Sequence, residues 1–279
     1  MSRRVEVELS ERVWDELERR SRETGGEVSA VLDETLREAF ELDGHTLFQV
    51  STSNALAQGV FGGAVTVATL KEHGDFGIGT FERLDGELIL LEGTCYRATA
   101  GGVVGEISDD AEVPFAAVTW FTPDIDFSLD EVTSLDALRN GLDSRRLSDN
   151  LFQGLRVDGR FESLQMRAAC PARPGEGLLE ATRHQSEFSA ADVEGTLVGF
   201  WAPEYAQTVG IPGYHFHFIS EDRGTGGHLL DLAASRLEVQ VQTESSLHLA
   251  MPDTSEFRAA ELGGDHRDEI DQAETGIGN

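Results

Sequence analysis

The feature that most constrains the fold is an alternation of apolar and polar residues that recurs along the chain from about residue 46. Side chains along a β-strand point in turn to opposite faces of the sheet, so this alternation predicts half-buried strands. Glycine and aspartate, which favour turns, stand between the alternating segments. The sequence therefore predicts strands near residues 86–91, 114–121, 152–158, 195–201, 214–219 and 236–242.

Helical spacing of apolar residues is less frequent in this part of the chain. The tail after Phe257 is polar, and its composition predicts disorder, with a short helix near Arg267–Ala273 as the alternative. Because strands outnumber helices, we expect an α/β fold with an α+β tendency, built from mixed or antiparallel sheets. The remaining expected helices are Ser53–Gly59, Val65–Lys71 and Ser134–Asn140, the last capped by Thr133 or Ser134.

Residues 1–43 follow a different pattern, so we expect a module of their own there, with Glu41–Gly44 as the linker to a larger domain over residues 46–279. Arg4–Leu9 alternates like a strand, a helix follows Ser10, and a second helix over Val28–Phe40 comes after Gly25–Gly26. This order resembles a ribbon-helix-helix module, which in that family is an intertwined dimer. A lone six-residue strand is not stable, which also favours pairing with a second chain.

Members of the ribbon-helix-helix family read DNA with the outward residues of the strand. Here those positions are Arg4, Glu6 and Glu8, and residues 1–43 carry 13 acidic against 7 basic side chains. Carboxylates repel the phosphates that flank a DNA groove. We therefore interpret the module as a homodimerisation device and not as a DNA reader.

The whole chain is strongly acidic, with 51 Asp and Glu against 22 Lys and Arg and a net charge of −29. Such a charge argues against nucleic acid or a membrane surface as the main partner. Lys71 is the only lysine, and an acid-rich, lysine-poor composition favours adaptation to a cytoplasm with molar salt, where the Debye length shrinks to about 3 Å. An ordinary acidic protein from a GC-rich genome is the alternative.

Neither a secretion signal nor a membrane span is indicated, because the sequence has no charged n-region before an apolar h-region and no run of 18 apolar residues. Cys95 and Cys170 are too few for a disulfide framework or a thiolate metal site. A reducing cytoplasm is the simplest expectation.

The strongest chemical motif is Tyr214–Phe218, which reads Tyr-His-Phe-His-Phe. In a strand, His215 and His217 share one face and the aromatic residues share the other. A Gly-rich turn follows, and His228 begins the next apolar run, so a hairpin would fold it back beside the pair. Three neutral imidazoles form a catalytic zinc site with open positions; core histidines or a solvated face are the alternatives.

Several long segments resemble the acetolactate decarboxylase family, and the resemblance runs from about Phe48 to near the C-terminus. It implies a two-domain α/β protein with mixed sheets and a Zn²⁺ ion held by His215, His217 and His228. The implied reaction converts 2-acetolactate to acetoin and CO2. The segments that carry the resemblance are His73–Phe81, Leu84–Leu88, Phe152–Arg167, Gly195–Tyr205, Gly210–Ile219 and Gly226–Asp231.

The same resemblance implies two glutamates and an arginine at the metal. Glu87 and Arg167 match the first glutamate and the arginine, and Glu274 is the best counterpart of the second glutamate, with Glu261 as the fallback. Loss of CO2 leaves charge on the ketone oxygen of an enediolate, which a Lewis acid stabilises. Arg167 would orient a carboxylate and a glutamic acid would deliver the proton.

Two other functions remain open from the sequence. One is a ligand-responsive DNA-binding regulator that uses the decarboxylase fold as a sensor. The other is a zinc hydrolase or isomerase that acts on another hydroxy-keto acid. DNA binding distinguishes the first from a decarboxylase, and CO2 release from acetolactate distinguishes the second.

Overall fold

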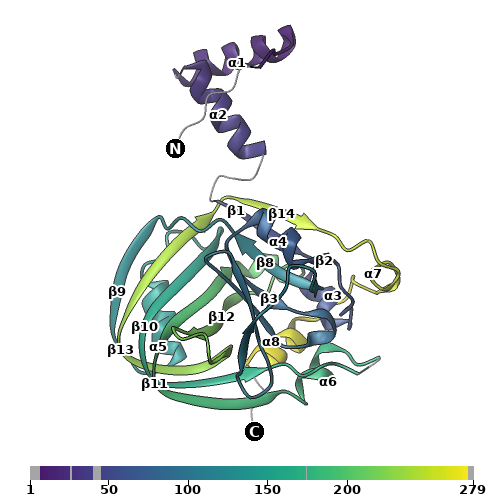
Figure 1. The fold of residues 1–279 in the computed structure, drawn as a ribbon, viewed down its shortest axis with the longest axis vertical. Helices are drawn as coiled ribbons and strands as arrows, with labels where there is room; N and C mark the ends of the chain where they lie inside the picture. Colours follow the sequence, from purple (N-terminus) through teal and green to yellow (C-terminus); the bar gives the residue numbers. More distant parts are fainter. Residues whose placement is uncertain (1–6, 26, 40–44, 174, 276–279) are drawn as a thin grey trace. The chain divides into compact units, whose positions relative to one another are not determined.

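A computed structural model describes residues 7–25, 27–39, 45–173 and 175–275 of the chain. The chain divides into two compact units, Met1–Asp43 and Gly44–Asn279. Figure 1 shows the helices of the first unit and the sheets of the second. The larger unit contains both of the main sheets, so the fold is of the mixed α+β type.

The N-terminal unit consists of two helices, α1 (Glu11–Thr24) and α2 (Val28–Ala39). Helix α1 ends at Gly25, whose left-handed φ of 71° suits glycine. The first half of the expected strand Arg4–Leu9 lies outside the described residues, and its described part, residues 7–9, forms no strand. Among the described residues of the unit, the buried apolar side chains are Leu17 and Val31, as the helical spacing requires.

The first sheet of the larger unit has seven strands in the order β14-β1-β8-β3-β4-β5-β6 (Figure 1). It is mixed, because β1 runs parallel to β14 and antiparallel to β8. A separate two-stranded ladder pairs β2 (Val65–Thr66) with β7 (Glu112–Val113). The seven strands are β1 (Thr46–Val50), β3 (Phe76–Thr80), β4 (Glu87–Leu91), β5 (Thr94–Ala98), β6 (Val104–Glu106), β8 (Phe115–Thr119) and β14 (Ser246–Ala250).

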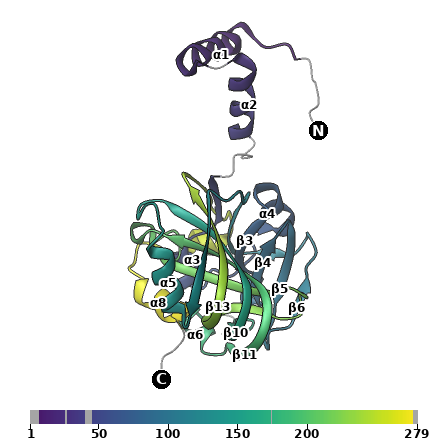
Figure 2. The same ribbon diagram turned by 90° about the vertical axis from the view of Figure 1, so that its left-hand side faces the viewer.

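The second sheet is antiparallel and has the order β10-β11-β12-β13-β9. Because β10 pairs with β13 as well as with β11, strands β10 to β13 close on themselves. The strongly curved strands β10, β11 and β13 are visible in Figure 2. The five strands are β9 (Ile125–Val132), β10 (Phe152–Ala168), β11 (Ser186–Ala202), β12 (Gly213–Ser220) and β13 (Gly226–Glu244).

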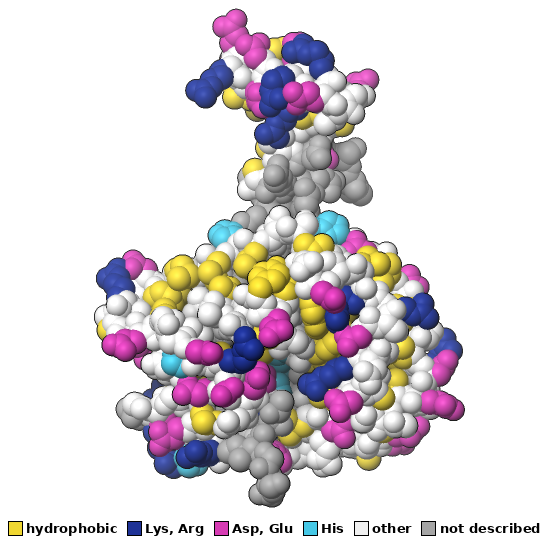
Figure 3. All heavy atoms as spheres, turned by 180° about the vertical axis from the view of Figure 1, so that it is seen from behind, with side chains coloured by type: hydrophobic (Ala, Val, Ile, Leu, Met, Phe, Trp, Pro, Cys, Tyr) yellow, Lys and Arg dark blue, Asp and Glu magenta, His cyan; other side chains and the backbone are white. Residues whose placement is uncertain are grey.

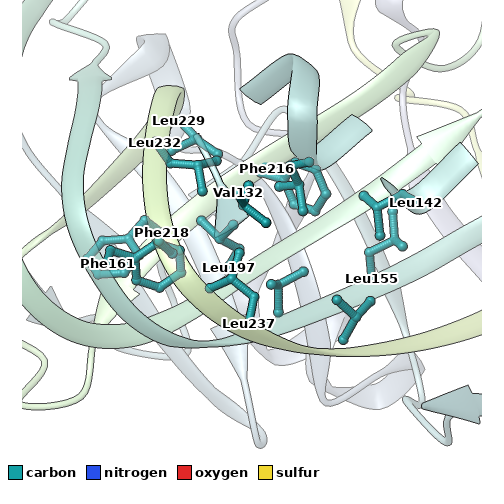
Figure 4. Packing of buried hydrophobic residues seen from close by; sticks show 14 of the residues in the cluster. Val132, Leu142, Leu155, Phe161, Leu197, Phe216, Phe218, Leu229, Leu232 and Leu237 are labelled. Atoms are coloured by element: carbon teal, nitrogen blue, oxygen red, sulfur yellow. The ribbon is translucent and has the colours of Figure 1, made fainter. Parts of the chain in front are cut away.

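Alternation along the strands distributes the apolar residues over three layers. Leu88 and Leu90 of β4 face a cluster that includes helix α4, whereas Ile89 and Leu91 face the second sheet. Inside the curved second sheet a third cluster is formed by residues of β9 to β13 and helix α5, among them Phe216 (Figure 4). The fully buried strand β4 therefore separates two cores, with one of them between the sheets.

In the described part of the larger unit, six α-helices accompany the sheets. Thr52, Thr66 and Ser134 cap three of these helices, because their hydroxyl groups accept a bond from the first-turn N–H groups. Short 3-10 turns occur at Glu82–Leu84 and Glu204–Ala206. The helices are α3 (Ser53–Ala57), α4 (Val67–His73), α5 (Leu135–Asp143), α6 (Leu178–Thr182), α7 (Ser255–Ala259) and α8 (Arg267–Thr275).

All six expected strands occur, but β10, β11 and β13 are longer than the alternation predicts. Strand β10 continues beyond its expected end, whereas β11 and β13 begin before their expected starts, in segments that mix apolar and polar residues. One-sided solvent exposure of a sheet allows such mixed segments. The expected helix Val65–Lys71 begins only at Val67, since the preceding two residues pair with β7. The composition of the polar tail predicts disorder, but the structure contains α7 and α8 there, because α8 buries Ile270 and Ala273.

Acidic side chains are spread over the surface, as Figure 3 shows for one face. Several arginines contact two carboxylates each; Arg160, for example, contacts Asp192 and Glu194. This pairing follows from the composition, in which acidic residues outnumber basic ones by 51 to 22. Among the described residues, no helix is long and apolar enough to cross a membrane.

Candidate metal centre

Strand β12 places two histidines on one face. Its Tyr214, Phe216 and Phe218 pack in or against the core inside the second sheet. His215 and His217 therefore point to the opposite face, toward the layer between the two sheets. The hairpin to β13 brings His228 directly opposite His217 in the register. The three histidines of the sequence motif thus lie side by side.

The three histidines bring one ring nitrogen each to a common point. Nε2 of His215 lies 3.1 Å from Nε2 of His217 and 3.1 Å from Nδ1 of His228. All three ligand atoms lie within 4.8 Å of one another. A tetrahedral site with metal–nitrogen bonds of about 2.0–2.1 Å separates its nitrogens by about 3.3 Å. The spacing of this cluster therefore fits a divalent cation.

Backbone carbonyls fix the orientation of two of these rings. Nδ1 of His217 donates to the carbonyl of Leu88 over 2.8 Å. Nε2 of His228 donates to the carbonyl of Glu274 over 3.1 Å. Each bond assigns the proton to the nitrogen outside the cluster, so the nitrogen inside is free to bind a cation.

Burial keeps the histidines neutral. It lowers the pKa of His215 and of His217 to about 3, and the nearby Arg167 acts in the same direction. The pKa of His228 also lies well below its usual range for these reasons. Neutral imidazole is the form that binds metals, so the rings are ready to do so at neutral pH.

Glu87 approaches the cluster from the other sheet, at the first position of β4. Its Oε1 accepts a hydrogen bond from the backbone N–H of Ala169 over 2.8 Å, and its Oε2 lies 3.6 Å from Nε2 of His217. Burial raises the pKa of Glu87 to about 7, while Arg167 and the Ala169 bond oppose the rise. The carboxyl group is therefore able to hold a proton near neutral pH.

Arg167 lies on β10 directly opposite His228, with only 5% of the residue exposed. One arm of its guanidinium donates to the carbonyl of Ala273 and, over 3.1 Å, to the side-chain oxygen of Gln185. The other arm, Nη2, lies 3.9 Å from Oε2 of Glu274. Arg167 therefore contacts both the cluster and the end of helix α8.

Glu274 enters from helix α8, which packs on α3 and α6. Its Oε2 lies 3.5 Å from Nε2 of His215 and 3.7 Å from Nε2 of His228. This oxygen is buried and has no hydrogen-bond partner among the described residues. Burial raises the pKa of Glu274, and Arg167 opposes the rise. An unpartnered carboxylate oxygen beside three imidazoles also fits a cation at this point.

These side chains line a cavity of about 50 Å³ between the two sheets. Apolar residues complete its wall, among them Leu56, Phe115 and Ile211. A wider groove of about 780 Å³ shares Ile211, His228 and Glu274 with this cavity. The cluster is thus buried but adjoins an open groove.

The structure brings together all six site residues expected from the sequence. Glu261, the fallback for the second glutamate, is exposed and lies outside the residues that line the cavity. Sequence reasoning missed Gln185 and the carbonyls of Leu88, Ala273 and Glu274. Backbone carbonyls leave no residue-type signal, so only the strand register and helix placement reveal them.

The fold and the site together define an α+β protein with a buried three-histidine centre. A family model described as "Alpha-acetolactate decarboxylase" matches residues 47–264. The chain belongs to the alpha-acetolactate decarboxylase family, whose members are carboxy-lyases. Glu274 lies beyond the matched residues, so its assignment depends on the geometry described above.

The matches to individual relatives extend over most of the chain. The chain is 40% identical over 229 residues to the alpha-acetolactate decarboxylase of Methanosarcina mazei, covering 82% of this chain and 80% of that protein. It is 37% identical over 217 residues to the alpha-acetolactate decarboxylase of Bacillus licheniformis, and this match covers 77% of this chain and 86% of that protein. The crystal structure of the alpha-acetolactate decarboxylase from Bacillus subtilis strain 168 superposes with a TM-score of 0.80 at 34% sequence identity. The superposition covers 83% of this chain and 100% of that chain.

Proposed function

We propose that this chain converts 2-acetolactate to acetoin and CO2, with a Zn²⁺ ion held by His215, His217 and His228. The observation that carries the proposal is the convergence of three neutral imidazoles, two carboxyl groups of raised pKa and one arginine on a single cavity. The relatives that cover most of the chain carry the name of this activity. Nitrogen ligands of this kind suit zinc, although other divalent ions also bind imidazole.

The cleaved bond joins the substrate's carboxylate to its hydroxyl-bearing carbon, and its electron pair moves toward the adjacent ketone, giving an enediolate. When bound, the cation supplies a Lewis acid that stabilises this negative charge. Arg167 holds the departing carboxylate through Nη2, since its other arm is fixed on Ala273 and Gln185. Arg167 therefore contributes a positive charge that binds the substrate carboxylate and a fixed position that orients it.

Acetoin forms only when a proton reaches the carbon that lost CO2. Glu87 and Glu274 flank the cluster from β4 and α8, and each has a raised pKa. We assign proton delivery to this pair, because a carboxylic acid in a dry cavity keeps its proton near neutral pH. Solvent then returns the proton, so that each turnover consumes one.

The direct experiment follows CO2 and acetoin after addition of 2-acetolactate to the zinc-loaded protein in molar KCl. We expect both products in equal amounts, and little turnover of hydroxy-keto acids without a carboxylate beside the hydroxyl carbon. Hydrolysis or isomerisation without CO2 release would contradict the proposal.

We also propose that residues 1–43 form a ribbon-helix-helix-like module that makes the protein a homodimer. Support comes from apolar side chains left exposed on the helices: Val13, Trp14 and Leu36 are each about half exposed. Light scattering should give the mass of two chains for the whole protein and the mass of a single chain after deletion of residues 1–43, while kcat/KM stays unchanged. A truncated protein that still has the mass of two truncated chains, or specific binding of DNA by the whole protein, would refute this assignment.

The acidic surface supports a further proposal, that the protein works in a salt-rich cytoplasm. Salt screens the repulsion among the 51 acidic side chains. The midpoint of thermal unfolding should therefore rise steadily with KCl up to molar concentration. A midpoint independent of KCl would contradict salt adaptation.

A further inference from the structure

His215 has less backbone and hydrogen-bond support than the other two histidines. In the register of β12, the pairing with β13 covers His217 to Ile219, whereas Tyr214 and His215 pair only with β11. Among the described residues, the ring of His215 hydrogen-bonds only the other two histidines, and its remaining polar neighbour is Oε2 of Glu274 at 3.5 Å. The position of this ring must therefore depend on side-chain packing at the start of β12.

Arg146 supplies such packing. It follows helix α5, and its side chain is only 14% exposed. The guanidinium carbon lies 4.2 Å from the centre of the Trp201 ring, a close cation–π contact. Nη1 donates to the hydroxyl of Tyr214 over 2.9 Å, and Nε donates to Asp149 over 2.8 Å. One side chain therefore joins the loop after α5 to two strands of the second sheet.

The two aromatic residues that Arg146 contacts are a cross-strand pair. Trp201 of β11 lies directly opposite Tyr214 of β12. The Tyr214 hydroxyl also donates to Asp143, which in turn pairs with Arg146. This closed set of contacts fixes the residue that immediately precedes His215.

We propose that Arg146 is a positioning residue for the metal centre, which holds His215 in place through Tyr214. The inference depends on the proposed metal centre. Groups that orient a metal ligand typically change metal affinity by about 10–100-fold when removed. Arg146 lines the wide groove and packs on the edge of the core inside the second sheet through Trp201 and Tyr214, so the test includes a milder variant that removes only the Tyr214 hydroxyl.

The test measures cobalt binding, not catalysis. Metal-free wild type, Arg146→Ala, Arg146→Lys and Arg145→Ala are titrated with Co²⁺ against a chelator, and the visible absorption of the bound ion is recorded. Arg145 is the matched control, because its guanidinium lies over the Phe127 ring, 5.5 Å from its centre, and among the described residues it makes no hydrogen bond to Tyr214.

We expect Arg146→Ala to weaken Co²⁺ binding by about 10–100-fold and to shift the absorption bands. Arg146→Lys should restore only part of the affinity, since an ammonium group cannot stack and bond in a plane as a guanidinium does. Arg145→Ala should match the wild type. Tyr214→Phe, which removes only the hydroxyl, should give a smaller shift in the same direction and tests the inference even where Arg146→Ala fails to fold.

Unchanged affinity and spectrum in Arg146→Ala, or in Tyr214→Phe if the first variant does not fold, would overturn the inference and leave the metal centre intact. A wild-type chain that binds no Co²⁺ would overturn the metal centre itself, and this inference with it. The two failures are therefore distinguishable.

Discussion

Arg167 and His228 occupy directly opposed positions on strands β10 and β13, and His228 is in turn opposed to His217 on β12. Directly opposed residues of a sheet face the same side. One row across three strands therefore sets the spacing between the arginine and two of the proposed metal ligands. A slip of one residue in any of these strands would turn a member of the row to the other face.

The first prediction concerns the double role of Arg167. Lysine at this position keeps the charge but cannot bond Ala273 and Gln185 while a second arm faces the cavity. We expect Arg167→Lys to lower kcat/KM by about 100-fold or more, consistent with lost orientation of the substrate. Hydrogen exchange should also become faster in helix α8. Steady-state kinetics and exchange mass spectrometry check both effects.

Arg156→Lys is the matched control for this variant, because Arg156 lies on the same strand but pairs with Glu92 and Asp158. It should behave like the wild type in both measurements. If Arg167→Lys had a normal kcat/KM, Arg167 would have no role in the reaction.

The second prediction separates proton transfer from metal binding. Glu87→Gln and Glu274→Gln keep the size of the side chain but cannot release a proton. Each should lower kcat by about 10²–10⁴-fold, the usual contribution of general acid catalysis, while zinc remains bound. Stopped assays of acetoin together with metal analysis measure the two properties.

Glu261→Gln serves as the control, since Glu261 is exposed and the structure places it outside the cavity. It should keep wild-type turnover. Should Glu261→Gln be impaired and Glu274→Gln remain active, the second glutamate has been assigned to the wrong residue.

The third prediction uses Glu244, a buried carboxyl group that does not belong to the three-histidine centre. Glu244 is 1% exposed, its Oε2 has no hydrogen-bond partner among the described residues, and burial raises its pKa to about 7. Bonds from Thr119 and Gln242 and the nearby His45 oppose the rise, and Asp124 adds to it.

Since the pKa of Glu244 is higher in the folded than in the unfolded chain, the folded state binds the extra proton between about pH 4.5 and pH 7. The free energy of unfolding should therefore fall across this window as pH rises. Glu244→Gln removes this contribution, so its stability relative to the wild type should increase from about pH 5 to about pH 8. Denaturant titrations at fixed KCl measure the free energy of unfolding of both proteins. If the difference between Glu244→Gln and the wild type did not change with pH, the prediction would be wrong.

Local sequence pattern predicts much of this fold because each rule acts within a few residues. The alternation in Tyr214–Phe218 correctly separates the two histidines from the aromatic residues, and the Gly-rich turn correctly predicts the hairpin to His228. Ser134 caps its helix as its residue type suggests. These features need only the period of a strand, a turn signal and a hydroxyl group.

Other features depend on contacts that no local pattern encodes. Residues of β10 beyond Asp158 mix polar side chains with buried Phe161, Leu164 and Met166, and they continue the strand because β11 and β13 pair with them on both sides. The placement of Glu274 depends on the packing of α8 against α3 and α6, and a polar tail gives little indication of it. The expected N-terminal strand has no counterpart in residues 7–9, where pairing would have to come from another chain.

The central claim is that three imidazole nitrogens hold a divalent cation on which decarboxylation depends. The most direct test measures the metal content per chain of the wild type and of His217→Ala by mass spectrometry, alongside acetoin formation from 2-acetolactate. The account predicts one divalent ion per wild-type chain, and loss of both ion and activity in His217→Ala. A metal-free His217→Ala protein with wild-type activity would contradict it.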